Sequence, residues 1–320
     1  MSTGSVVIVT YNSVECVAPC LQALAQFADW KILVVDNASS DATVQVVRRI
    51  APHVSLLCNS ENRGFAGAVN QGIKAAEGEV VVILNADAIP TDGALERMTR
   101  VAAGEGVGVV GGSLRKSDGS VERGFTVRRF PTLTSALAEV LLLNRLWPNN
   151  PWNRNYRCLA LDYATLQEVE QPAGACLAIR RQAWEDIGGF DENFYPVWFE
   201  DVDFCRRVRN GGWKVLYCPD AVFMHSGAHS VGKLRFRDRQ SFWYRNLLRY
   251  FAKHHPGWRF QVLRVSVVLG LVVRSVVAAV GGGPAGVSAR EAVAAYRNAA
   301  WQDAVACREF AARTANRTAG

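Results

Sequence analysis

Four short groups of polar residues in the N-terminal part of the chain have the types and the spacing to bind one ligand together. Each group follows directly on a run of apolar residues and offers amide, carboxylate or hydroxyl oxygens. The groups are Thr10-Tyr11-Asn12, Asp36-Asn37, the residues from Asn59 to Gly64, and Asn85-Ala86-Asp87. Asparagine and aspartate are common in turns and caps, so one group alone would mean little. Four groups in the same relation to four apolar runs predict a nucleotide-binding cleft.

The elements that must position these groups are predicted from the apolar runs. Short β-branched runs span residues 5–10, 31–36, 54–59 and 79–85, and segments with helical spacing lie between them at 14–28, 41–50 and 65–77. Strands that are apolar on both faces and alternate with helices indicate an α/β fold, with a mostly parallel central sheet and helices on both faces. In such sheets ligands bind beyond the carboxyl ends of the strands, where the polar groups fall.

One glycine motif needs a separate interpretation. The stretch GVGVVG, residues 106–111, matches the dinucleotide-binding pattern letter for letter. That pattern requires a strand before it and a helix that opens within it. Here the glycines lie inside a strand-like run that leads to the polar turn KSDG at 116–119, so we expect no nicotinamide or flavin cofactor.

The composition is that of a folded protein in a reducing compartment. The chain has 320 residues, of which 49% are hydrophobic and 20% are charged, so it can bury a sizeable core. Its eight cysteines include no C-x-x-C pair, which favours free buried thiols over a disulfide framework or a zinc site. The N-terminus MSTGSVVIVTYN lacks the features of a secretory signal. We therefore expect a cytoplasmic location.

The basic residues are concentrated in one region. Between Arg206 and Arg274 fourteen Lys and Arg residues stand against Asp220 and Asp238, so this region accounts for the net charge of +7 and the rest of the chain is at −5. Such a region suggests phosphate groups, anionic lipid or nucleic acid as a partner, or else a solvated face with none. No nucleic-acid recognition motif is readable, so we expect no nucleic-acid partner.

Short motifs in a fixed order carry a family resemblance. VVIVTYNS, VVDNASSD, NRGFAGAVNQGI, LNADA and GGFDENFYPVWFEDVDFCRR, between residues 5 and 230, resemble a family 2 glycosyltransferase of the GT-A fold. Within that family, WPNNPWNRNYR at 147–157 together with FEDVDFC is similar to the bacterial rhamnosyltransferases that build cell-wall linkers and O-antigens. The resemblance implies a nucleotide-sugar-binding half, 1–115, an acceptor-binding and catalytic half, 116–258, and a C-terminal helical extension, 259–320.

The resemblance implies how the donor is held. The family binds the base of its nucleotide at the ends of the first two strands, which here are Thr10, Tyr11, Asn12 and Asp36. An acid there can accept a hydrogen bond from a pyrimidine N3–H or a sugar hydroxyl, and an aromatic ring can stack. In the third motif, small residues let a ligand approach a helix N-terminus, which favours anions. The donor contacts implied there are Arg63, Gly67 and Asn70, although the stretch alone is equally typical of a packed helix cap.

The group Asn85-Ala86-Asp87 occupies the family's DxD position, whose acids hold a divalent ion against the donor's diphosphate. Asn85 brings no negative charge, so Asp87 must carry most of the metal binding. The resemblance implies His225, which follows the apolar run 221–224, as a second protein ligand, although His229 is near in sequence. Oxygen ligands suit Mg²⁺ or Mn²⁺, and an imidazole favours Mn²⁺.

The stretch FEDVDFCRRVRNGG, residues 199–212, coincides with the family's catalytic E-D motif at a predicted helix start. Transfer with inversion needs a base that takes the proton of the acceptor hydroxyl as it attacks the anomeric carbon. The match implies Asp201 as this base and Glu200 as the residue that orients the acceptor, while we interpret Asp203 as structural. The alternative is that these acids only stabilise the helix through its dipole, by about 0.3–1 kcal/mol each. The predicted acceptor contacts are Gly174 and Trp198.

Residues 233–258 carry most of the basic excess. The resemblance implies that Arg235 and Arg237 neutralise the donor's diphosphate. Farther along, Arg245, Arg249 and Lys253 share one face of a predicted amphipathic helix.

The apolar stretch 262–283 is the candidate membrane segment. Arg264 and Arg274 interrupt it, so we expect attachment at the membrane interface rather than a span. The alternatives are a core helix and a homodimer contact through the C-terminal helices.

Together, these features predict a glycosyltransferase in cell-envelope glycan synthesis at the inner face of the membrane. We expect transfer of L-rhamnose from dTDP-rhamnose, with inversion, onto a lipid-linked or polysaccharide acceptor, because the uncharged Asn85 suits a deoxyribose donor. The alternatives are a UDP-hexose-using glycosyltransferase of the same fold and a sugar-nucleotide nucleotidyltransferase. The second would usually carry a glycine-rich, lysine-bearing first loop, which TYNSVE at 10–15 is not.

Overall fold

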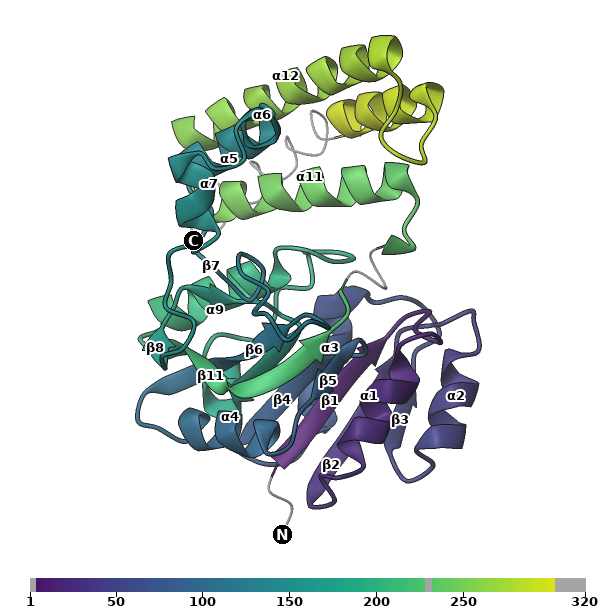
Figure 1. Ribbon diagram of the computed structural model, residues 1–320, viewed down its shortest axis with the longest axis vertical. Coiled ribbons are helices and arrows are strands. Elements are labelled where there is room, and N and C mark those ends of the chain that lie inside the picture. The colour runs from purple at the N-terminus through teal and green to yellow at the C-terminus, as the bar shows by residue number, and fades with distance from the viewer. Residues whose placement is uncertain (1–3, 228–231, 303–320) are drawn as a thin grey trace, which may run out of the picture. The chain divides into compact units, whose positions relative to one another are not determined.

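The computed structural model of the protein describes residues 4–227 and 232–302 (Figure 1). By their packing, these residues form two compact units. The first holds the described residues of Met1–Phe130, Arg157–Pro196 and Glu200–Gly232, and the second those of Pro131–Tyr156, Val197–Phe199 and Lys233–Gly320. The predicted segments 1–115, 116–258 and 259–320 divide the chain by role and stay a prediction. By packing, the helical unit also takes in residues 131–156.

The first unit is built on a nine-stranded sheet. Eight strands follow the order β3-β2-β1-β4-β10-β6-β11-β5, and β8 pairs with β11. Their bounds are β1 Gly4–Thr10, β2 Trp30–Asp36, β3 Ser55–Cys58, β4 Val80–Asn85, β5 Ala88–Pro90, β6 Val107–Arg115, β8 Gln167–Glu168, β10 Cys176–Arg180 and β11 Lys214–His225. A separate two-stranded sheet joins β7 (Val127–Arg128) to β9 (Gln171–Pro172).

The register of the parallel strands gathers the predicted polar groups. β1 pairs in parallel with both β2 and β4, so that Thr10 lies opposite Asp36 and Val9 lies opposite Asn85. The stretch GVGVVG lies along β6, as predicted. β10 runs antiparallel to β4 and β6, and β5 runs antiparallel to β11, so the second half of the sheet is mixed. The predicted α/β class is confirmed, and the parallel pairing joins β3, β2, β1 and β4.

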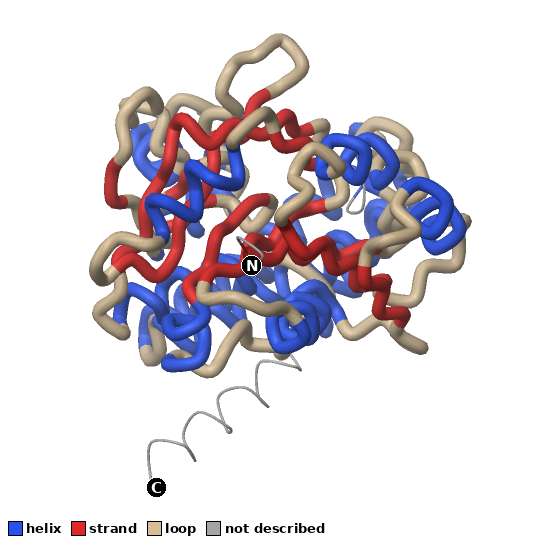
Figure 2. The backbone as a smooth tube through the Cα atoms, turned by 90° about the horizontal axis from the view of Figure 1, so that it is seen from below, coloured by secondary structure: helices blue, strands red, loops and turns tan. Residues whose placement is uncertain are grey.

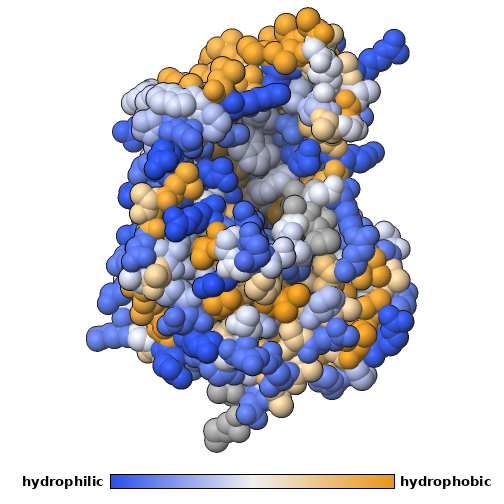
Figure 3. All heavy atoms as spheres, viewed as in Figure 1, coloured by the Kyte–Doolittle hydropathy of each residue, from blue (hydrophilic) through white to orange (hydrophobic). Residues whose placement is uncertain are grey.

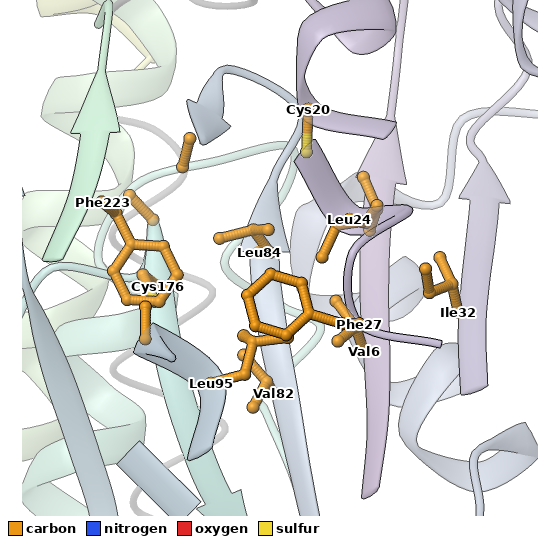
Figure 4. Packing of buried hydrophobic residues seen from close by; sticks show 14 of the residues in the cluster. Val6, Cys20, Leu24, Phe27, Ile32, Val82, Leu84, Leu95, Cys176 and Phe223 are labelled. Atoms are coloured by element: carbon orange, nitrogen blue, oxygen red, sulfur yellow. The ribbon is translucent and has the colours of Figure 1, made fainter. Parts of the chain in front are cut away.

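Helices cover both faces of this sheet (Figure 2). They are α1 Val17–Leu24, α2 Thr43–Ile50, α3 Gly64–Ala75, α4 Ala94–Ala102, α8 Arg181–Asp186 and α9 Glu200–Asn210. Successive side chains of a strand point to opposite faces. Val6 therefore packs with Leu24 of α1 and Leu95 of α4 (Figure 4), while Val7 belongs to the cluster that includes Phe204 of α9. The seven described cysteines are free thiols, and five of them are buried.

The second unit is helical. Its helices are α5 Leu133–Val140, α6 Leu143–Leu146, α7 Pro151–Tyr156, α11 Phe236–His254 and α12 Trp258–Gly281, followed by a helical stretch from residue 289 to 302. α12 packs on α5 and α11. The inward faces of α11 and α12 bury residues such as Leu247, Phe251, Leu263 and Leu271. Within the described part of the chain, α12 is the one helix whose length and composition would let it cross a membrane.

Candidate active site

The ends of β1 and β2 form a hydrogen-bonded pair. The hydroxyl of Thr10 donates to Oδ1 of Asp36 at 2.9 Å, and Ser39 donates to the same carboxylate from its hydroxyl at 2.6 Å and from its backbone N–H at 2.9 Å. Asp36 is buried. A carboxylate has about four acceptor positions, so three protein donors leave one for a ligand. The structure thus places Thr10 and Asp36 together, where a base N–H could be bound.

Asn12 shapes the loop beside this pair. Its backbone is in the left-handed region, with φ of 50°, and its side-chain oxygen accepts from the backbone N–H groups of Ser40 and Asp41. Its own N–H donates to the hydroxyl of Ser39 at 2.9 Å. Tyr11 precedes it and is half-buried. Asn12 therefore connects the loop after β1 to the loop after β2 by hydrogen bonds, and Tyr11 lies beside it at the edge of the sheet.

The side chain of Asn70, in the third motif, forms four hydrogen bonds within the protein. Asn70 of α3 donates its amide to the carbonyl of Phe190 at 2.8 Å and to Oε1 of Glu192 at 3.0 Å. Its side-chain oxygen accepts from Nε1 of Trp184 at 3.2 Å and from the N–H of Phe190 at 2.9 Å. These four bonds use both amide hydrogens and both oxygen lone pairs. Asn70 therefore holds the loop after α8, and its donor-binding role stays a prediction.

Gly67 and Arg63 lie against the same loop. A Cβ on Gly67 would stand 3.2 Å from the Cβ of Arg63 and 3.4 Å from Oε2 of Glu192, so no side chain fits without a shift of its neighbours. Nη2 of Arg63 lies 3.9 Å from Oε2 of Glu192. Among Arg63, Gly67 and Asn70, only Arg63 carries a charge. Its side chain is partly exposed, so a ligand can reach that charge.

The group Asn85-Ala86-Asp87 meets the end of β11. β5 follows this group and pairs antiparallel with β11, which sets Ala88 opposite His225. As a result, Oδ1 of Asp87 lies 3.7 Å from Nε2 of His225, with 9% of the Asp87 side chain and 2% of the His225 side chain exposed. Asn85 is half-buried, and its N–H donates to the carbonyl of Ala175 at 2.9 Å. The predicted metal ligands are therefore neighbours.

The surroundings of His225 fit a metal ligand. Its Nδ1 lies 3.0 Å from Oε2 of Glu122, and the ring of Phe125 stacks on it with centroids 5.2 Å apart. A proton on Nδ1 is satisfied by the Glu122 carboxylate, which leaves the Nε2 lone pair facing Asp87. The Asp87 carboxylate suits Mg²⁺ or Mn²⁺, and the imidazole nitrogen favours Mn²⁺. Within residues 4–227 and 232–302, no cluster of three or more His, Cys, Asp or Glu side chains forms a complete metal cage.

Asp201 lies in the first turn of α9 with its carboxylate held on both oxygens. Oδ2 accepts from the N–H of Gly174 at 3.0 Å and from Nε2 of Gln171 at 3.1 Å, and Oδ1 accepts from the N–H of Val202 at 2.8 Å. Burial raises the pKa of the Asp201 carboxyl, although the hydrogen bonds from Gly174 and Val202 and the charge of Arg128 act to lower it. A raised pKa makes the carboxylate a stronger proton acceptor, as a general base requires.

Gly174 lies close against the side chain of Asp201. A Cβ on Gly174 would stand 3.0 Å from the Cβ of Asp201, so a side chain here would require its neighbour to shift. The next residue, Ala175, bonds through its carbonyl to Asn85. The predicted acceptor contact of Gly174 stays a prediction. Gly174 and Ala175 connect the carboxylate of Asp201 to the backbone of Asn85.

The acids beside Asp201 differ in surroundings. Glu200 is 4% exposed, and burial, followed by the negative charge of Asp201, raises its pKa well above the usual value. In the described part of the chain its Oε2 has no hydrogen-bond partner. Asp203 is fully buried and accepts from Nε of Arg207 at 2.7 Å, which agrees with the structural interpretation.

The remaining predicted residues belong by packing to the second unit. Trp198 is half-buried, and it and Phe199 both have positive φ, 76° and 72°, which is uncommon for bulky residues. Nε of Arg235 donates to Asp238 at 2.8 Å, and Nη2 of Arg237 donates to Asn298 at 2.9 Å. The acceptor role of Trp198 and the diphosphate role of these arginines stay predictions. His229, the alternative ligand, lies outside the described residues.

Sequence reasoning missed the segment Glu122–Arg128, which contacts His225. Glu122 and Phe125 contact His225, and the guanidinium of Arg128 lies 5.4 Å from the centre of the Phe125 ring. A lone acid in a turn after β6 carries no spacing pattern of its own. Only the return of the chain to His225 reveals these contacts.

Comparison with known proteins identifies the family of the chain. The model of glycosyl transferase family 2 matches residues 5–188, and that of glycosyl transferase family 21 matches residues 160–306. The N-acetylglucosaminyl-diphospho-decaprenol L-rhamnosyltransferase of Mycobacterium tuberculosis is 31% identical over 263 residues, which cover 76% of this chain and 81% of the relative. The rhamnosyltransferase WbbL of Escherichia coli is 22% identical over 255 residues, which cover 78% of this chain and 92% of the relative.

Solved glycosyltransferases share the fold. The mannosyltransferase PcManGT from Pyrobaculum calidifontis, solved in complex with GDP-Man and Mn²⁺, aligns with a TM-score of 0.54 at 21% identity and covers 96% of this chain and 86% of its own. Residues 1–349 of TarS from S. aureus align with a TM-score of 0.50 at 16% identity. The GT-A fold and the resemblance to bacterial rhamnosyltransferases are thereby confirmed. The chain belongs to glycosyl transferase family 2 and is a glycosyltransferase.

Proposed function

We propose that this glycosyltransferase moves a sugar, with inversion, from a nucleotide diphosphate donor onto a lipid-linked or polysaccharide acceptor in cell-envelope glycan synthesis. The observation that carries the proposal is the meeting of Asp87 with His225, 3.7 Å apart, at the edge that also holds the Thr10–Asp36 pair. The names of the relatives support it, because the two described above are rhamnosyltransferases and one acts on a decaprenol-linked saccharide.

The donor would lie along the edge from β2 to β11. Asp36 and Thr10 would bind the base with Tyr11 and Asn12 beside it, Arg63 and the backbone at Gly67 would face the anionic part, and Asn85 and Ala86 would line the ribose side. Asp87 and His225 would hold Mg²⁺ or Mn²⁺, which supplies positive charge to the leaving diphosphate when bound. Arg235 and Arg237 would add further positive charge. PcManGT was solved with Mn²⁺, which supports a divalent ion in this fold.

Asp201 would act as the general base. Its carboxylate would accept the proton of the acceptor hydroxyl as the oxygen attacks the anomeric carbon from the face opposite the diphosphate, which inverts that centre. Glu200 would orient the same hydroxyl, because its raised pKa favours a protonated carboxyl that can donate a hydrogen bond. The Gly174 N–H and the Gln171 amide keep the base carboxylate in place.

The donor is proposed to be dTDP-rhamnose. Asn85 has no charge with which to hold a ribose hydroxyl, and a deoxyribose donor needs none there. We expect donor hydrolysis, assayed with Mn²⁺ across dTDP-, UDP- and GDP-sugars, to be fastest with dTDP-rhamnose. Hydrolysis of UDP-hexoses alone would refute the rhamnose proposal and favour the UDP-hexose alternative, while release of inorganic diphosphate from a nucleoside triphosphate would favour the nucleotidyltransferase.

The enzyme is further proposed to act from the cytoplasm at the inner face of the membrane, through α12. One face of this helix is apolar and exposed, from 40% at Val262 to 87% at Val280 (Figure 3). The exposed residues between them are Val265, Leu269, Val272, Val273, Val276 and Val277. Fourteen Lys and Arg against three Asp and Glu in the described part of the second unit favour an anionic surface.

The opposite face of α12 is held inside the second unit, which favours interfacial attachment over a span. Phe260, Leu263, Val267 and Leu271 are buried there. The guanidinium of Arg274 donates to the carbonyls of Val140 and Glu139 at the end of α5. A span would have to remove these contacts, because both faces of the helix would then meet lipid.

A vesicle experiment tests this attachment. Full-length protein should co-sediment with vesicles that contain phosphatidylglycerol and much less with pure phosphatidylcholine. Combined Val265→Ser, Leu269→Ser and Val272→Ser changes should weaken the partition at least about tenfold, since each buried CH₂ contributes about 0.8 kcal/mol. The control is Leu166→Ser, which changes an exposed leucine of the first unit. Unchanged partition of the triple variant would contradict the proposal, and a concentration-dependent dimer that the triple variant dissolves would assign the face to a second copy.

A further inference from the structure

The imidazole of His225 is enclosed by one short segment of chain. The side chain is 2% exposed. Phe125 covers a face of the ring, with 12° between the two planes, and Oε2 of Glu122 meets Nδ1 at 3.0 Å. Both contacts come from the turn after β6, three residues apart, rather than from the strand that carries His225. The ring is therefore fixed on two sides by a separate element.

That turn is itself rigid. The carbonyl of Glu122 accepts from the N–H of Phe125 at 3.1 Å and from the N–H of Thr126 at 3.0 Å, while the N–H of Glu122 donates to the carbonyl of Leu114 at 2.9 Å. The fully buried hydroxyl of Thr126 bonds to the carbonyl of Glu122 at 3.0 Å. The turn thus sets the Glu122 carboxylate and the Phe125 ring at fixed places against the end of β11.

We propose that Glu122 is a positioning residue for the metal-binding function of His225. Its carboxylate accepts a hydrogen bond from Nδ1–H, which selects the tautomer whose Nε2 lone pair is free and turns that nitrogen toward Asp87. A carboxylate in this place also makes the imidazole a better electron donor to a metal. This inference rests on the proposed metal role of Asp87 and His225.

The geometry separates a positioning role from a ligand role. Glu122 engages Nδ1, whereas Asp87 lies on the side of Nε2, so the two carboxylates address opposite nitrogens of one ring. A metal ion bound between Asp87 and Nε2 would contact His225, and the imidazole ring would separate it from Glu122. The effect of Glu122 must therefore pass through the tautomer and the orientation of the ring.

The test measures Mn²⁺ binding by the full-length protein without turnover. Binding of Mn²⁺, alone and with dTDP or UDP, is followed by the loss of the free Mn²⁺ EPR signal. Glu122→Ala should weaken binding by about 10- to 100-fold, the usual effect of losing an outer carboxylate. Glu122→Gln should lose less, because its amide oxygen can still accept a hydrogen bond from Nδ1–H. Glu168→Gln, which removes a partly exposed acid that pairs with Arg209, is the matched control and should bind as wild type.

A second readout reports the ring directly. In ¹⁵N-histidine NMR spectra of the metal-free protein, His225 should carry its proton on Nδ1, and Glu122→Ala should shift it toward Nε2. If His225→Ala weakens Mn²⁺ binding but neither Glu122 variant does, the positioning role is wrong and the metal site stands. If His225→Ala binds Mn²⁺ as wild type, the proposed metal role itself fails. If Glu122→Ala does not fold, the Mn²⁺ binding and the His225 tautomer of Glu122→Gln test the positioning role instead.

Discussion

Replacing Asp201 by asparagine is expected to lower kcat for sugar transfer by about 10²- to 10⁴-fold, the usual contribution of a general base, while donor binding is retained. The amide keeps the size of the side chain but cannot take the acceptor's proton. Initial transfer rates measure the loss, and calorimetric titration with the nucleoside diphosphate measures donor binding. Asparagine also has only one acceptor oxygen, whereas Asp201 accepts on both, so a loss of stability of about 1–3 kcal/mol is expected. Rates are therefore compared well below the melting temperature.

The pH dependence gives this prediction a second readout. Burial raises the pKa of Asp201, so the wild-type rate should fall as the pH is lowered through a value above that of an ordinary aspartate. The direction follows because only the ionised carboxylate accepts a proton. The asparagine variant has no group to titrate there and should lose this limb of the profile.

Asp203→Asn is the matched control for Asp201→Asn. It lies on the same helix two residues on, is fully buried and pairs with Arg207. It should lower the melting temperature because a buried ion pair is weakened. Its kcat should stay close to wild type, since the side chain faces away from the Gly174 contact. Near-wild-type turnover by Asp201→Asn, or an equal loss in both variants, would contradict the base assignment.

The strands and their polar ends could be predicted because local pattern and fold agree there. Val6, Val7 and Ile8 are all buried, which needs a strand covered on both faces, and a run of β-branched residues is typical of such a strand. Parallel pairing of β1 with β2 and β4 then brings Thr10, Asp36 and Asn85 to one edge without further information. The first turn of α9, which holds the proposed base Asp201, likewise carried its own motif.

The contacts that could not be predicted depend on which distant segments meet. Asn70 looks the same in sequence whether it binds a nucleotide or a loop, and only the return of residues 184–192 to α3 uses up its amide. The direction of β10 could not be predicted either, because an apolar run does not indicate whether the neighbouring strands are parallel or antiparallel to it. Glu122 was the hardest residue to predict, because its partner His225 lies far along the chain, at the end of β11.

Replacing Asp87 by alanine is the second change with a large expected effect, the loss of Mn²⁺-dependent transfer. Asp87 is the one carboxylate of its group, because Asn85 is neutral, so its removal leaves the imidazole of His225 as the only predicted protein ligand. Positive charge at a leaving diphosphate contributes several kcal/mol in the transition state. The rate should therefore fall about 10³-fold or more. Initial rates after treatment with EDTA, across a titration with Mn²⁺, measure this: wild type should recover and the variant should not at any concentration.

Asp92→Ala tests whether the effect comes from charge in general or from this position. Asp92 is an exposed acid five residues farther along the same segment, so its removal changes the net charge by the same amount and should leave recovery by Mn²⁺ unchanged. Wild-type turnover that persists in EDTA would remove the metal role from Asp87. A transfer rate of Asp87→Ala that Mn²⁺ restores would contradict the prediction, because the ion would then be bound without the Asp87 carboxylate, with His225 as the remaining predicted protein ligand.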